Sequence, residues 1–301
     1  MNVVMYLVCL LAWGLNFIAI KIQGHTVPLE QSLLYRLAVT TLVFVALVAL
    51  LKPGGKPRSK DWGYLAAFGV LNLSLSYLLL YYATIWISAA LVTLVFSLKT
   101  IGTPLALRLF LKQDLHPTVL VGGLIGVCGV GLVLYPMLGQ TMTGAAWTGL
   151  GYAVLGMLLT SVGDACSARN TRVGIHPLRA NAVGFCVATV LLAALCAFQG
   201  QRWQFDMSAR YVGALLYLTL VASCLAWLFY LKLVERIGAA ASSYMVALFP
   251  AVGGIGSAVI GESEPTLYLV AGCLVSCIGA TIALGGKRFW GTAQRQIENA
   301  S

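Results

Sequence analysis

The sequence predicts an all-α integral membrane protein with ten transmembrane helices, arranged as two inverted five-helix repeats. Two observations lead to this prediction. Hydrophobic residues make up 60% of the 301 residues and charged residues only 9%, a composition more apolar than that of soluble domains. The chain also repeats itself at an offset of 150 residues, since residues 87–134 align with 237–284 without a gap. Identities at this offset include Ile87/Ile237, Ala89/Ala239, Leu98/Leu248, Gly122/Gly272, Gly129/Gly279 and Leu134/Leu284.

Each copy contains five apolar segments of about 20 residues, the length that one membrane crossing requires. An odd number of crossings makes the second copy enter the membrane from the opposite side, an arrangement characteristic of secondary transporters. We expect a first repeat over 1–137, a second over 138–286 and a cytoplasmic tail over 287–301. The predicted spans are 3–23, 31–51, 63–84, 88–110, 117–137, 147–167, 178–199, 210–233, 239–260 and 266–286.

The net charge of +10 is distributed unevenly along the chain. If the N-terminus is inside, nearly all basic residues fall in the inner loops and the tail, as the positive-inside rule requires. Both termini are therefore expected in the cytoplasm, and the basic excess needs no nucleic acid partner. The inner basic residues are Lys52, Lys56, Arg58, Lys60, Arg108, Lys112, Arg169, Arg172, Arg179, Lys232, Arg236, Lys287, Arg288 and Arg295.

Motifs for metal binding or catalysis are missing from the sequence. The eight cysteines lie in or beside spans and form no CxxC pair, so we expect neither disulfides nor a metal site. His25, His116 and His176 fall in predicted loops, and the chain has no GxSxG or HExxH motif. We therefore expect no catalytic residue, no cofactor and no enzymatic activity.

Lys99 is the most informative single residue for function. It lies near the middle of span 88–110, about 16 Å along the axis from either end, beyond the roughly 6 Å reach of a snorkelling lysine. Charged residues at such depth are usually functional, and we expect Lys99 to bind the carboxylate or another anionic group of a substrate. An internal pair with a carbonyl or with Asp164 is the structural alternative.

The remaining charged residues near the spans are expected to be structural. Asp164 is predicted to pair locally with Arg169. Arg36 and Lys21 lie close to predicted span ends, where snorkelling accounts for them. Glu30 and Glu262 are assigned to outer loops.

Aromatic and small polar residues recur at helical spacing on several spans. Such faces do not all point at lipid, and aromatic walls with few polar anchors are typical of small-ligand pockets. We expect a central cavity lined by both repeats, although core packing is the alternative for any one aromatic residue. The predicted substrate-binding residues are Trp13, Asn16, Phe17, Tyr77, Tyr81, Phe96, Lys99, Trp227, Tyr244 and Phe249.

Two prolines, Pro104 and Pro250, lie in corresponding spans of the two repeats, about one turn apart under the offset. A proline inside a helix removes a backbone hydrogen bond and kinks the span. We expect these residues to be hinges that open the site to alternate sides, with a static bend as the alternative.

Several segments resemble the drug/metabolite transporter superfamily, EamA type. They are WGLNFIAIK at 13–21, Arg36-Leu37-Ala38, Phe249-Pro250 and Gly261-Glu262. The first repeat departs from that pattern, with Lys99-Thr100 in place of Phe-Pro and Lys112-Gln113 in place of Gly-Glu. Among its members the chain looks most like the bacterial aromatic amino acid exporters, which implies a bacterial inner membrane location.

The sequence therefore predicts a secondary transporter that exports small amphipathic metabolites, with aromatic or large neutral amino acids as the expected substrates. Export of drugs, nucleosides or sugar phosphates is the alternative, as is a facilitative, channel-like permease. Proton or sodium coupling stays open, because Asp164 is the only acid placed within a span. The expected partners are the lipid bilayer and a small molecule, in a monomer or homodimer.

Overall fold

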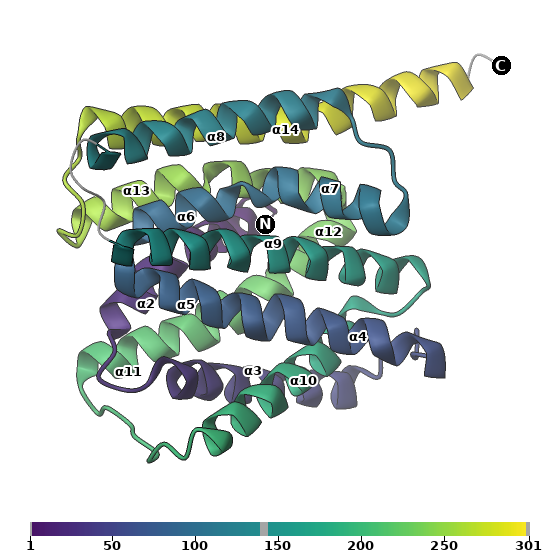
Figure 1. Cartoon of the computed structure of the whole chain (residues 1–301). Helices are drawn as coiled ribbons and strands as arrows, with labels where there is room; N and C mark the ends of the chain where they lie inside the picture. Colours follow the sequence, from purple (N-terminus) through teal and green to yellow (C-terminus); the bar gives the residue numbers. More distant parts are fainter. Residues whose placement is uncertain (1, 139–143, 299–301) are drawn as a thin grey trace.

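The computed structural model describes residues 2–138 and 144–298, apart from the side chains of 136–138, 234, 235, 237–244 and 284–298. Its elements are helical and lie roughly side by side in one bundle (Figure 1). The helices are α1 (Asn2–Gly14), α2 (Asn16–Gln23), α3 (Leu29–Leu51), η1 (Ser59–Asp61), α4 (Trp62–Phe68), η2 (Gly69–Leu75), α5 (Ser76–Trp86), α6 (Ala89–Ser97), α7 (Lys99–Leu111), α8 (Pro117–Leu138), α9 (Gly144–Arg172), α10 (Pro177–Phe198), α11 (Ala209–Leu216), η3 (Tyr217–Leu225), α12 (Ala226–Ser243), η4 (Tyr244–Leu248), α13 (Phe249–Val259) and α14 (Leu267–Glu298).

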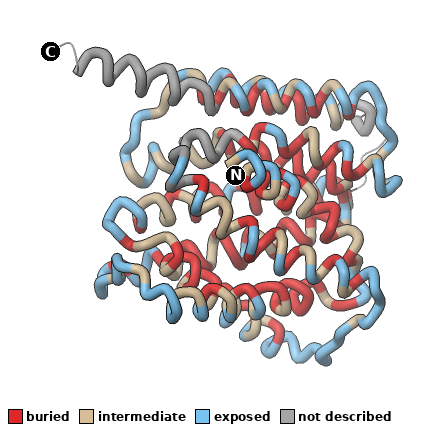
Figure 2. Tube along the Cα trace, turned by 180° about the vertical axis from the view of Figure 1, so that it is seen from behind, coloured by how far each residue is buried: buried red, intermediate tan, exposed pale blue. Residues whose placement is uncertain are grey.

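Within the described residues, seven helices are long and apolar enough to cross a membrane. The pair α1–α2, bent by 43°, would be an eighth span, and Met245–Val259 and Leu267–Ala283 form shorter apolar helices. Most of the predicted tail belongs to α14, which runs to Glu298. Buried residues concentrate on the helix faces that meet inside the bundle (Figure 2). Large apolar side chains such as Leu42, Leu109 and Leu124 are exposed.

The helix starts follow from capping residues in the connections. The hydroxyls of Ser88 and Ser208 accept hydrogen bonds from backbone N–H groups at the start of α6 and α11. Pro117 and Pro177 occupy the first position of α8 and α10, where the missing N–H of proline costs nothing. These residues fix the positions at which α6, α8, α10 and α11 begin.

Besides the bent pair α1–α2, two more predicted spans change their helical pattern part-way along. Span 88–110 divides at Leu98 into α6 and α7, and span 239–260 divides at Leu248 between η4 and α13. At the first break, the hydroxyls of Ser97 and Thr100 bond to backbone carbonyls within the turn, a competition that bends helices. Leu98 and Leu248 are equivalent under the 150-residue offset.

Two π-helical segments also occupy equivalent positions. η2 covers Gly69–Leu75, and η3 covers Tyr217–Leu225, which includes the residues 150 positions later. A π-turn shifts the side chains that follow it around the helix axis, and such segments are frequent at functional sites. The hydropathy pattern of the sequence predicts neither segment.

Helices α8 and α14 pack closely along their length (Figure 1). A Cβ atom added at Gly122 would lie 2.3 Å from the carbonyl oxygen of Gly279, and one at Gly129 would lie 2.7 Å from that of Gly272. The contacts therefore run in opposite directions along the two helices. Small residues allow this approach of backbones in lipid, and the Ser276 hydroxyl donates to the Gly126 carbonyl at its centre.

Gly122→Ala should destabilise the protein by about 1–3 kcal/mol, because the added methyl overlaps the backbone of α14. Gly131→Ala is the matched control in the same helix, since a Cβ there meets nothing within 4 Å. Thermal unfolding in detergent measures both variants. Equal melting temperatures for the two would contradict the close packing of α8 on α14.

Candidate functional site

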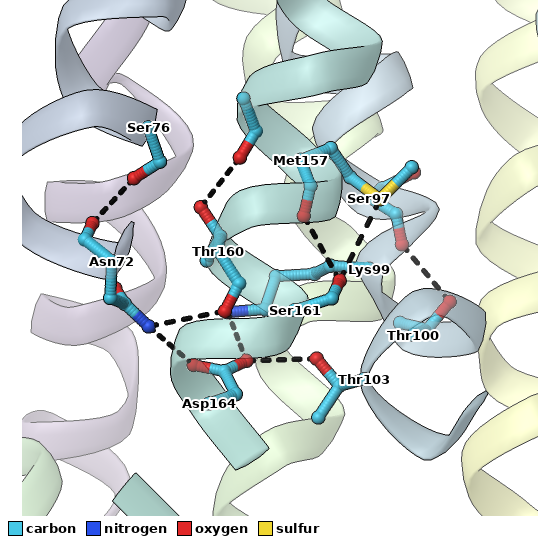
Figure 3. Close-up of polar contacts among 11 residues, drawn as sticks. Asn72, Ser76, Ser97, Lys99, Thr100, Thr103, Met157, Thr160, Ser161 and Asp164 are labelled. Carbon is cyan, nitrogen blue, oxygen red and sulfur yellow. Dashed lines mark hydrogen bonds and ion pairs between the residues drawn. The ribbon is translucent and has the colours of Figure 1, made fainter. Parts of the chain in front are cut away.

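The first polar cluster surrounds an ion pair between Lys99 and Asp164, whose Nζ and Oδ2 atoms lie 3.0 Å apart (Figure 3). Asn72 donates to Oδ1 of the same carboxylate at 2.8 Å, and Thr103 donates to Oδ2 at 2.8 Å. Lys99 also lies over the ring of Phe96, 5.3 Å from its centre. The carboxylate, on α9, is thus held by one cation and two neutral donors, of which Lys99 and Thr103 come from α7 and Asn72 from η2.

Local distortions of the backbone deliver these groups. Asn72 belongs to the π-helix η2, and Lys99 is the first residue of α7, directly after the break at Leu98. The Asn72 side chain also donates to the carbonyl of Thr160 at 3.2 Å, which fixes its amide against α9. The predicted local pair of Asp164 with Arg169 is wrong, because Arg169 reaches Asp61 at 2.6 Å instead.

The second polar cluster centres on Arg36 in α3, which is 1% exposed. Its Nε donates to Ser223 at 2.9 Å, Nη2 donates to Asn16 Oδ1 at 3.0 Å, and Nη1 donates to Tyr81 at 3.3 Å. The guanidinium also lies 5.1 Å from the centre of the Tyr77 ring. The prediction that Arg36 snorkels to a span end is therefore wrong.

A signal for Arg36 was present in the sequence. Ser32, Arg36 and Thr40 are spaced by four residues, so they share one face of a helix. All three are buried in the structure. A polar stripe on an otherwise apolar span points into the bundle, because lipid offers no hydrogen-bond partners.

Aromatic side chains lie beside the two clusters. Trp13, Trp227 and Tyr230 form one group, with ring centres between 5.3 and 6.1 Å apart. The indole of Trp13 donates to the carbonyl of Ala222 at 2.9 Å, whereas the buried Nε1 of Trp227 has no partner in the described residues. Tyr230 is an aromatic member that the predicted set lacks.

The remaining predicted residues join the same region. Phe17 packs edge-on against Phe96, with ring centres 5.6 Å apart. Phe249 is buried in an apolar cluster against which Trp13 and Phe96 pack. The side chain of Tyr244 lies outside the described residues. The structure thus gathers Asn16, Tyr77 and Tyr81 around Arg36, and the other described residues of the predicted set around Lys99 and Trp13.

Charged contacts tie the repeats together at one end of the bundle, named here the Glu262 end, where α2 finishes and α6 begins. Glu262 pairs with Lys21 at 2.9 Å and accepts a hydrogen bond from the backbone N–H of Ala89 at 3.0 Å. Lys21 is therefore paired with a carboxylate rather than simply snorkelling. Glu30, predicted in a loop, is buried in the first turn of α3 and contacts Tyr82 and Gln199.

The opposite end, named here the Asp61 end, has both a closed and an open part. Arg169 binds Asp61 and lies 4.2 Å from the centre of the Tyr64 ring. Elsewhere at this end α1 and α12 border a mainly apolar cleft of about 260 Å³, which is lined by Val4, Met5, Phe229, Lys232 and Arg236. Met5 and Phe229 also pack in the apolar cluster that contains Phe249.

The two predicted hinge prolines lie close to the helix breaks without occupying them. Pro104 is inside α7, six residues after Leu98, and Pro250 is in the first turn of α13, two residues after Leu248. A proline in a first turn fits the helix. The regular α-helical pattern is interrupted at Leu98 and begins after Leu248, so each predicted hinge proline lies a few residues beyond such a point.

A model of the EamA-like transporter family matches the chain twice, over residues 1–135 and 147–285. The chain belongs to this family. An uncharacterised transporter of Archaeoglobus fulgidus is 20% identical over 278 residues, covering 90% of this chain and 94% of its own length. One from Clostridium kluyveri is 21% identical over 232 residues, covering 75% and 73%.

The fold of this EamA-like protein is also found in a solved crystal structure. That chain superposes with a TM-score of 0.68 at 20% identity, and the match covers 96% of this chain and 98% of the other. At this level of identity the likeness concerns the fold alone. The protein is a multi-pass membrane protein of a transporter family, and its substrate must be argued from the residues above.

Lys99→Met and Asp164→Asn should each destabilise the protein by about 1–3 kcal/mol, less than for a fully buried pair, because both side chains keep some exposure. The double variant should lose clearly less than the sum of the two, since the singles leave one charge unpaired. Thermal unfolding measures all three. Arg108 and Asp114, an exposed pair, supply the control, and additive losses at Lys99 and Asp164 would contradict their coupling.

Proposed function

We propose that this protein is a secondary transporter that exports small amphipathic metabolites, with aromatic or large neutral amino acids as substrates. One observation carries the proposal: an acid–base pair, Lys99 and Asp164, borders a group of aromatic side chains that includes Phe96. An amino acid has a carboxylate, an ammonium group and an apolar side chain. Lys99 would take its carboxylate, Asp164 its ammonium group, and the rings of Trp13, Phe96 and Trp227 its side chain.

A zwitterionic substrate suits this pair because it replaces one ion pair by two. Neither Lys99 nor Asp164 is left without a countercharge when the substrate enters, so the large cost of an unpaired charge at membrane depth is avoided. Asn72 and Thr103 hold the carboxylate of Asp164 in place meanwhile. In this proposal, Lys99 and Asp164 therefore pair with each other when no substrate is bound.

We also propose that the chain consists of two inverted five-span repeats. Three observations support this arrangement: the family model matches twice, the helix breaks at Leu98 and Leu248 are equivalent, and so are η2 and η3. The close contacts of α8 with α14 add a fourth, because Gly122–Gly279 and Gly129–Gly272 exchange under the offset. Equivalent helices that run antiparallel are related by a two-fold axis perpendicular to them, as inverted repeats require.

The contacts at the two ends support alternating access. Lys21 and Glu262 close the Glu262 end, while the cleft beside Met5 and Phe229 opens at the Asp61 end. The basic residues around Asp61 favour a cytoplasmic position for this end in a bacterial inner membrane. We propose that the segments at Leu98 and Leu248, with Pro104 and Pro250 beside them, bend when the Glu262 end opens. The protomer contains a complete site, as a monomer or within a homodimer.

Counterflow in proteoliposomes tests the proposed function. Vesicles loaded with unlabelled phenylalanine, tryptophan or leucine should accelerate the uptake of trace labelled phenylalanine, because a carrier exchanges its substrates across the membrane. Lys99→Met should abolish this exchange in protein that still elutes as a folded species. Absence of exchange with every amino acid in folded wild-type protein would refute the amino acid assignment and direct the search to nucleosides, sugar phosphates or drugs.

Lys21→Met should loosen the Glu262 end, because it removes the ion pair across the repeats while leaving the bond from Ala89 to Glu262. Hydrogen–deuterium exchange should rise in residues 16–23 and 257–266 and stay unchanged in α4, since local opening follows lost contacts. Lys56→Met, an exposed lysine in the connection before η1, is the control. Unchanged exchange in residues 16–23 would contradict the closing role of Lys21.

A further inference from the structure

We infer that Arg36 is a second anion-binding group on the transport path, which receives the carboxylate of the substrate closer to the Glu262 end than Lys99 does. The inference rests on the proposed transport of amino acids and adds a binding group to it. Three observations support it. Arg36 has no acidic partner among the described residues, two of its neutral contacts are only partly buried, and it lies at a different depth from Lys99.

The first observation is that Arg36 has no carboxylate partner. It is the one buried base among the described residues, and no acid of this part of the chain lies within 4.0 Å of it. Other bases inside the bundle or at its ends pair with acids: Lys21 with Glu262, Lys99 with Asp164 and Arg169 with Asp61. A guanidinium stays charged under all physiological conditions, so a positive charge without a counterion is buried at this point.

Neutral groups hold this charge incompletely. A guanidinium has five N–H groups, and Arg36 donates three hydrogen bonds within the described residues, to Ser223, Asn16 and Tyr81. The bond to Tyr81 is the longest, at 3.3 Å. The terminal nitrogens Nη1 and Nη2 therefore each keep one further N–H group. Once Asn16 moves away from Nη2, the two nitrogens can bind both oxygens of a carboxylate, the geometry that arginine prefers.

Asn16 and Tyr77 are the contacts of Arg36 through which we expect a ligand to reach it. Both residues touch the guanidinium, and both are only partly buried. The Asn16 amide oxygen occupies the place on Nη2 that one oxygen of a carboxylate would take. A rotation of the Asn16 side chain would release this nitrogen, and a ligand that replaces it would stand against the Tyr77 ring.

The two cationic groups lie at different depths. Tyr81 contacts Arg36, and Asn72 contacts Asp164, on one continuous helical segment formed by α4, η2 and α5. Nine residues separate them, about 13 Å at the rise of an α-helix, with Tyr81 closer to the Glu262 end. A carboxylate that leaves Lys99 toward this end therefore approaches Arg36 next.

Competition against labelled phenylalanine exchange tests Arg36 with two unlabelled probes, phenylalanine and phenylalaninamide, which lacks the carboxylate. Wild-type protein should prefer phenylalanine by at least about tenfold, the effect of 1.4 kcal/mol. Arg36→Gln should reduce this preference at least about threefold, with the remainder supplied by Lys99. A purely structural Arg36 would change the amount of active protein but leave the ratio between the probes as it was.

Asn16→Asp gives a second test that does not remove the buried charge. The new carboxylate would pair with Arg36 and compete with that of the substrate, so the preference should again fall while the melting temperature holds or rises. Arg179→Gln is the control, since Arg179 donates to the backbone carbonyls of Pro53 and Gly54 at the Asp61 end. It should keep the wild-type preference.

The outcomes separate this inference from the proposed function. The role of Arg36 would be overturned, and amino acid transport left intact, if wild-type protein exchanges phenylalanine and both variants, Arg36→Gln and Asn16→Asp, keep its preference for phenylalanine over phenylalaninamide. Loss of preference in Arg179→Gln as well would also overturn it, because the effect would then be a general one. Wild-type protein without amino acid exchange would overturn both.

Discussion

Charged groups inside an apolar bundle need either a partner of opposite charge or a shell of polar groups, and this protein uses both solutions. Lys99 and Asp164 neutralise each other, and their pair joins α7 to α9 while Asn72 adds η2. Arg36 relies on Asn16, Tyr81 and Ser223, which come from α2, α5 and η3. Because lipid satisfies none of these groups, each cluster fixes how three or more helical segments meet. The packing of the surrounding apolar residues then has to follow the polar contacts.

Hydropathy and the internal repeat predict where helices lie, because both signals concern long stretches of sequence. The repeat relates Pro117 to Leu267, and α8 and α14 begin at these two residues. The breaks at Leu98 and Leu248 were not predictable in this way. At the first break, the hydroxyl groups of Ser97 and Thr100 compete for backbone carbonyls. At the second, Pro250 follows two residues later and fits the first turn of α13. The π-helices have no hydropathy signal at all, since one residue inserted into a turn leaves an apolar stretch apolar.

The candidate site, like the fold, is only partly predictable from the sequence. Depth along the span predicts that Lys99 faces the interior, and in the structure it pairs with Asp164, the structural alternative to a substrate. The predicted pairing of Asp164 with Arg169 is wrong, because Arg169 binds Asp61. Which charges meet depends on the rotation of neighbouring helices, and η2 and the break at Leu98 set that rotation. Arg36 was misjudged because distance to a span end says nothing about which face of the helix a residue occupies. The stripe of Ser32, Arg36 and Thr40 contains that information.

The backbone is more symmetric than its side chains. At the 150-residue offset, Lys99 corresponds to Phe249, Asp164 to Gly14, and Asn72 to Ala222, while Arg36 corresponds to Cys186. The second member of each pair is uncharged. Gly14 lies against Val252, and the carbonyl of Ala222 accepts a hydrogen bond from the Trp13 indole. In the proposed alternating mechanism, equivalent backbone breaks allow the two repeats to exchange conformations at similar free energy. The charges do not exchange with them, so the two states offer the substrate different groups. In this proposed mechanism, asymmetry of side chains on a symmetric backbone would give the two states of the carrier unequal affinities for the substrate.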